Sequence, residues 1–60
     1  MWVKVVWKDN TPYMVINGQE IKAEVYDLTG KKVQTVENSK FYIVQARTED
    51  GRKYAQIVIR

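Results

Sequence analysis

The sequence predicts a small all-β domain, because hairpin turn signals separate segments in which apolar and polar residues alternate. Asn17-Gly18 and Asp50-Gly51 are both flanked by such segments, which is the strongest local indication of a β-hairpin. No long segment carries apolar residues at helical spacing. We therefore expect about five to six short antiparallel strands, joined by tight hairpins into a small barrel of the SH3 or OB kind or into a sandwich.

The turn at Asn17-Gly18 fixes the pairing of the strands on either side of it. A two-residue turn pairs Met14 with Ile21 and places the apolar residues of both strands on one face. A shift by one residue would bury Lys22 and Glu24 instead. The first register is therefore expected, with Asn17 and Gly18 in structural roles.

The turn at Asp50-Gly51 is predicted by the same reasoning. A two-residue turn pairs Val44 with Ile57 and produces a second apolar face. A loop of three residues would set Val44 against Gln56 and mix polar with apolar positions. We therefore expect the two-residue turn here, with Asp50 and Gly51 as its central residues.

The segment 27–31 predicts a different turn. A three-residue loop over 28–30, with Gly30 in the left-handed conformation, pairs Val25 with Val33 and keeps the apolar face continuous. Asp27 is expected to cap this turn by accepting backbone N–H bonds. Further strands are expected over 2–8 and 33–36, and turns over 9–12 and 37–40.

Length and composition limit the chain to one domain over residues 1–60. It has no Cys, so disulfides and thiolate metal sites are excluded, and the redox compartment stays open. No apolar run is long enough for a membrane span, and no signal peptide is expected. The net charge of +3 permits an anionic partner without requiring one. The localisation cannot be predicted from these features.

The side chains that usually carry catalysis are scarce. The chain has no His, and Ser39 is its single serine. Its carboxylates are expected in turns or on solvated faces, where dispersed acids perform no acid–base chemistry: Asp9, Glu20, Glu24, Asp27, Glu37, Glu49 and Asp50. We expect no enzymatic activity, no metal site and no cofactor.

A nucleic-acid-binding face is the ligand hypothesis that the basic and aromatic residues permit, and the sequence signal for it is nonspecific. Small β-barrels bind single strands through basic grooves with aromatic stacking platforms. Here the expected register would set Arg47 opposite Tyr54 across the last hairpin. The candidate residues come from the first strand and the last hairpin: Trp2, Lys4, Lys8, Arg47, Lys53 and Tyr54. Solvated edge charges and cross-strand pairing would explain the same residues without a ligand.

The second half of the chain resembles a known family. Residues 23–33, AEVYDLTGKKV, and residues 41–60, FYIVQARTEDGRKYAQIVIR, resemble the two hairpins of the C-terminal sorting domains of the type IX secretion system. The chain departs from the family pattern at Lys40, where glycine is usual, and at Gln56, where lysine is common. The opening Pro-Asn-Pro-like segment is also missing. The resemblance implies a sandwich-like tail, without catalytic residues, that is exported to the bacterial outer surface.

Agreement between alternation, register and turn residues favours a third interpretation. The whole chain also looks like a de novo designed or idealised small β-barrel scaffold with no native ligand, because no polar residue is expected in its core. We take this as the leading hypothesis, with the sorting domain and the nucleic-acid binder as alternatives. A monomer without a required partner is expected. If the sheet stays open, exposed apolar strand faces predict a homodimer instead.

Overall fold

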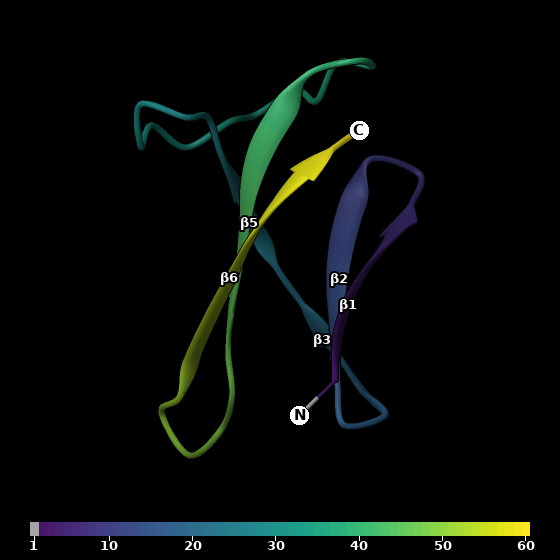
Figure 1. Cartoon of the computed structure of the whole chain (residues 1–60), viewed down its shortest axis with the longest axis vertical. Coiled ribbons are helices and arrows are strands. Elements are labelled where there is room, and N and C mark those ends of the chain that lie inside the picture. The colour runs from purple at the N-terminus through teal and green to yellow at the C-terminus, as the bar shows by residue number, and fades with distance from the viewer. Residues whose placement is uncertain (1) are drawn as a thin grey trace.

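The computed structural model describes residues 2–60 as two three-stranded antiparallel sheets, which lie side by side in Figure 1. The all-β prediction is therefore confirmed. The inner faces of the two sheets pack on one shared core. The first sheet has the order β1-β2-β3 and the second the order β4-β5-β6. The strands are β1 (Val3–Lys8), β2 (Thr11–Ile16), β3 (Gln19–Lys22), β4 (Glu24–Tyr26), β5 (Phe41–Arg47) and β6 (Lys53–Ile59).

The β2–β3 hairpin has the register that its turn predicts, with Met14 paired to Ile21. Asn17 and Gly18 have φ angles of 51° and 83°, and a turn whose two central residues both have positive φ matches the twist of the flanking strands. The backbone N–H of Asn17 also donates to the carbonyl of Trp2 at 3.2 Å, which extends the pairing of β1 with β2 beyond the strand ends.

The segment that follows this turn crosses from one sheet to the other at Ala23. The residues before it pair with β2, whereas those after it pair with β5. Ala23 is buried, and its N–H donates to the carbonyl of Pro12 at 3.0 Å. A small side chain at this point lets the backbone bend into the core. The segment therefore forms two short strands and joins the sheets covalently.

The loop after β4 is the predicted three-residue turn. The N–H of Asp27 donates to the carbonyl of Lys31 at 2.9 Å, and Gly30 has a φ of 92°. The N–H of Val33 donates to the carbonyl of Val25 at 2.9 Å, as the predicted pairing requires. The predicted strand over 33–36 is wrong, since pairing ends with one bridge between Tyr26 and Lys32. Residues 34 and 35 are polar and exposed, and a strand here would place the half-buried Val33 and Val36 on opposite faces, so the segment has no continuous apolar face to bury.

The β5–β6 hairpin differs from its prediction by one residue. Its loop has three residues, and Val44 pairs with Gln56 rather than with Ile57. The described residues with positive φ include Gly51 but not Asp50, so the two-residue turn that requires both is not formed. The turn geometry outweighs the apolar pattern here. As a result Val58 faces the core and Ile57 faces solvent.

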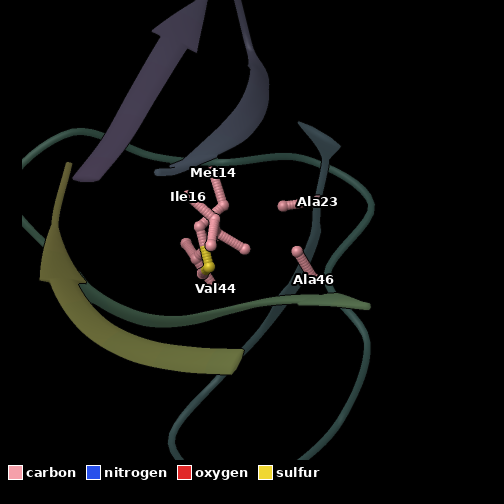
Figure 2. Close-up of a cluster of buried hydrophobic side chains, with 5 residues drawn as sticks. All are labelled: Met14, Ile16, Ala23, Val44 and Ala46. Atoms are coloured by element: carbon pink, nitrogen blue, oxygen red, sulfur yellow. The ribbon is translucent and has the colours of Figure 1, made fainter. Parts of the chain in front are cut away.

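The core lies between β2, Ala23 and β5 (Figure 2). Side chains from both sheets pack around it, and no polar or charged residue is buried in the described part of the chain. The central cluster consists of Met14, Ile16, Ala23, Val44 and Ala46. Strand alternation explains four of them, because Met14 and Ile16 on β2 and Val44 and Ala46 on β5 point inward while their neighbours along the strand point out. Ala23 reaches the core from the crossing between β3 and β4.

Two half-buried side chains of β6 and its C-terminal end bond to the backbone of β1 and the β1–β2 turn. Gln56 donates from Nε2 to the carbonyl of Val3 at 3.4 Å, and Arg60 donates from Nη2 to the carbonyl of Asp9 at 2.7 Å. Within residues 2–60, no backbone ladder connects these two strands. The two sheets are therefore connected by the chain at Ala23 and linked by side chains between β6 and β1.

Candidate functional site

The first three residues of the predicted nucleic-acid face lie on the outer face of the β1-β2-β3 sheet. Trp2 is exposed, and Lys4 and Lys8 follow it on the same side of β1. Lys8 pairs with Glu20, and its Nζ lies 4.9 Å from the centre of the Tyr13 ring. The hydrogen bond to Glu20 raises the pKa of Lys8 above its ordinary value. The charge of Lys8 is therefore already partnered within the chain.

The other three residues lie elsewhere. Arg47 and Lys53 face each other on the outer face of the β4-β5-β6 sheet. The predicted pair of Arg47 with Tyr54 is wrong, because the one-residue shift pairs Tyr54 with Ala46. Tyr54 faces inward and packs against the core. The fold therefore divides the six candidate residues between two sheets and does not gather them into one face.

The carboxylate of Asp27 organises the turn after β4. Its Oδ1 accepts from the Thr29 hydroxyl at 2.6 Å, from the Thr29 N–H at 2.9 Å and from the Lys31 N–H at 3.0 Å. The hydroxyl bond, followed by the backbone bonds, lowers the pKa of Asp27. The predicted capping role of Asp27 is confirmed.

The β5–β6 turn has the same backbone hydrogen bonds as the turn after β4, but its Asp and Thr side chains have exchanged positions. Thr48 takes the position of Asp27, and Asp50 takes that of Thr29. Thr48 donates its hydroxyl to Asp50, and this bond is the main cause of the lowered pKa of Asp50. The N–H of Arg52 is shared between Thr48 Oγ1 at 3.2 Å and Asp50 Oδ1 at 3.3 Å. Asp50 is therefore a turn residue, as predicted, although the turn itself is longer.

Further carboxylates form surface ion pairs. Glu24 accepts from Lys32 at 2.9 Å, which lowers the pKa of Glu24 and raises that of Lys32. Glu37 pairs with Lys40 at 3.0 Å. In the part of the chain that the structure describes, no three potential metal ligands of the His, Cys, Asp or Glu type come together. These carboxylates are engaged in turns and in ion pairs at the surface.

A groove of about 580 Å³ lies between the β2–β3 and β5–β6 turns. Its apolar wall includes Ile16, Ile21 and Tyr54, and its rim carries charges of both signs. A second hollow of about 420 Å³ lies beside β4 and the segment that follows it. Mixed charge at the larger groove provides no selectivity for an anion, and the groove therefore does not support the nucleic-acid hypothesis.

The outer face of the β4-β5-β6 sheet carries three large apolar side chains that are exposed. Phe41, Ile57 and Ile59 are 57%, 68% and 59% exposed, and the strand register places them together. Ile43 lies beside them and is half-buried. We call this the β6 surface: Phe41, Arg47, Lys53, Ala55, Ile57 and Ile59. Sequence reasoning missed it because the wrong register turned Ile57 and Ile59 into the core. The glycine-plus-basic pattern shared by 27–31 and 48–52 would have predicted the correct loop.

Comparisons with known proteins identify no relative. A scan against protein-family models, a search of curated proteins and a search of solved structures each found no match. Within residues 2–60 there is no helix long and apolar enough to cross a membrane.

Proposed function

We propose that this chain is a non-catalytic recognition module of the sorting-domain kind, a tail that directs export to the outer surface of a bacterium. The observation that carries the proposal is that the segment resembling the sorting domains corresponds to one complete sheet of the structure. Residues 23–60, which carry the resemblance, contain the whole β4-β5-β6 sheet and both three-residue turns. The motif residues therefore specify one sheet and the geometry of its two loops.

The β6 surface supports recognition over catalysis. A module that acts by being bound needs an exposed apolar area with a charged rim, and contiguous apolar patches on soluble proteins often mark interaction sites. Phe41, Ile57 and Ile59 supply the apolar area, while Arg47 and Lys53 supply charge at one end. The carboxylates are engaged in turns and ion pairs or lie exposed, so the surface chemistry is that of a binding module.

The idealised scaffold is the second candidate, because one observation favours it. Each glycine turn is matched by suitable side chains, and the core of the described residues is wholly apolar. A self-contained scaffold would, however, keep large apolar side chains off its surface. The exposed Phe41, Ile57 and Ile59 depart from that rule, and this departure leads us to prefer the recognition module.

Export of a reporter tests the proposal. The full chain is fused to the C-terminus of a periplasm-directed fluorescent protein in a bacterium with a type IX secretion system. We expect the reporter at the cell surface or in the medium, and in the periplasm of a strain lacking the system. The same reporter without the chain is the control. An identical distribution with and without the chain would contradict the proposal and favour the scaffold.

A further inference from the structure

The β6 surface includes a free strand edge. β6 lies at the end of its sheet (Figure 1), and no strand of the described part pairs with its outward-directed peptide groups. The contacts of Gln56 and Arg60 with β1 and the β1–β2 turn come from half-buried side chains on the inner face of β6 and at its C-terminal end, and they leave these peptide groups unpaired. The N–H of Thr48 donates to the carbonyl of Arg52 at 2.9 Å, and the N–H of Arg60 donates to the carbonyl of Lys40 at 3.0 Å. Antiparallel strands alternate between paired and outward-directed peptide groups. The peptide groups directed outward are therefore those of Lys53, Ala55, Ile57 and Ile59.

The same residues direct their side chains to the exposed face. Ile57 and Ile59 are exposed on β6, next to Phe41 on β5. A long apolar edge without a covering strand is a template for pairing with another chain. An added strand would satisfy the free peptide groups and at the same time cover part of this apolar area.

The charged end of the surface indicates what such a strand should carry. Arg47 and Lys53 are directly opposite each other, and like charges in this position destabilise a sheet. Within residues 2–60, neither side chain has an ion-pair partner. A carboxylate placed next to Lys53 would relieve this repulsion. A face-to-face second copy would instead bring further positive charge to the same end or leave the pair unneutralised.

We propose that the β6 surface docks an extended segment of a partner protein, which adds to β6 as an antiparallel strand. Alternate apolar side chains of the segment cover Ile59, Ile57 and Ala55, and a carboxylate at its C-terminal end lies next to Lys53. The inference rests on the proposed function for its biological setting, since this surface would be the part of the sorting module that is recognised.

A defined peptide tests the docking directly. The probe is a capped peptide in which valine alternates with threonine and whose last residue is aspartate, long enough to span β6. A matched peptide ends in lysine. Titration of isotope-labelled protein should shift and protect the backbone amides of Lys53, Ala55, Ile57 and Ile59. We expect the aspartate peptide to bind about threefold to tenfold more tightly than the lysine peptide.

Two variants and one control sharpen the test. Lys53→Glu should reverse the preference in favour of the lysine peptide, and Ile57→Thr should weaken binding about tenfold. Both positions are exposed, so the fold should persist. The control is Leu28→Thr, which removes an apolar side chain of 58% exposure from the turn after β4. It should leave peptide binding unchanged.

The outcomes separate this inference from the proposed function. Shifts confined to the groove between the turns, no shifts, or a preference that Lys53→Glu leaves unaltered would overturn the docking proposal. Self-association that Ile57→Thr abolishes, without peptide binding, would assign the surface to a second copy and also overturn it. Because these titrations use purified protein, peptide binding can succeed while reporter export fails, or fail while export succeeds.

Discussion

At the scale of single residues, the side chain of Asp27 determines the conformation of the turn after β4. One carboxylate oxygen accepts from the Thr29 hydroxyl, the Thr29 N–H and the Lys31 N–H. These bonds favour the charged form and lower its pKa from the ordinary 3.8. Replacement of Asp27 by Ala should leave the strands intact but lower the melting temperature by a few degrees at neutral pH, as calorimetry would show.

The same pKa shift predicts a pH dependence. Because the folded pKa of Asp27 lies below the unfolded one, its stabilising contribution is present above the unfolded pKa. It is lost as the pH falls through the folded pKa. The melting temperature of the parent should therefore fall more than that of Asp27→Ala upon acidification below 3.8. Leu28→Thr, an exposed change in the same turn that removes no titratable group, should show the parent's slope. Parallel curves for Asp27→Ala and the parent would refute the role of the carboxylate.

At the scale of elements, the register of β6 is open to direct measurement. The structure turns Val58 toward the core and leaves Ile57 exposed. Val58→Thr should therefore destabilise the fold by about 1 kcal/mol, because it places a hydroxyl against apolar side chains. Ile57→Thr should change the free energy of unfolding by about 0.5 kcal/mol or less. Urea denaturation gives the free energy of unfolding of both variants. A larger loss for Ile57→Thr than for Val58→Thr would contradict this register and support the two-residue turn that the apolar pattern predicted.

The loop itself provides a second prediction. Gly51 has a φ of 87°, and a Cβ placed on it would meet no atom within 4 Å. Substitution by alanine therefore costs only backbone strain, about 1–2 kcal/mol. Gly51→Asn should cost less, since asparagine adopts positive φ more readily. Equal unfolding midpoints in urea for Gly51→Ala and the parent would show that the turn does not need this conformation.

The two hairpins show how far the sequence predicts the elements. At Asn17-Gly18 the turn residues and the apolar pattern agree, and the register followed from either. At Asp50-Gly51 the turn residues and the apolar pattern disagree, because β6 carries apolar residues on both faces. The register that aligned the larger number of apolar residues on one face was therefore the wrong one. The crossing at Ala23 was not foreseen either, since a bend between sheets depends on tertiary packing and leaves no periodic signal. The β6 surface was not predicted either, because the wrong register placed Ile57 and Ile59 in the core.

At the scale of the whole molecule, the side chain of Arg60 links the two sheets on the side opposite Ala23. Its guanidinium lies 4.7 Å from the centre of the Trp7 ring, and its Nη2 donates to the carbonyl of Asp9 at 2.7 Å and to Asn10 Oδ1 at 3.4 Å. A domain of this size has a small core, so one contact between sheets is a substantial part of its stability.

Removal of this link should therefore affect the molecule as a unit. We expect Arg60→Ala to lower the free energy of unfolding by about 1–2 kcal/mol, through loss of the stacking on Trp7 and of the bonds to the β1–β2 turn. Arg60→Lys should restore only part of this, because an ammonium lacks the planar face that stacks on the ring. Lys4→Ala, an exposed change on the same strand as Trp7, should unfold like the parent in urea. If Arg60→Ala also does so, the sheets are held together by the core and by the crossing at Ala23, and the opposite side contributes nothing measurable.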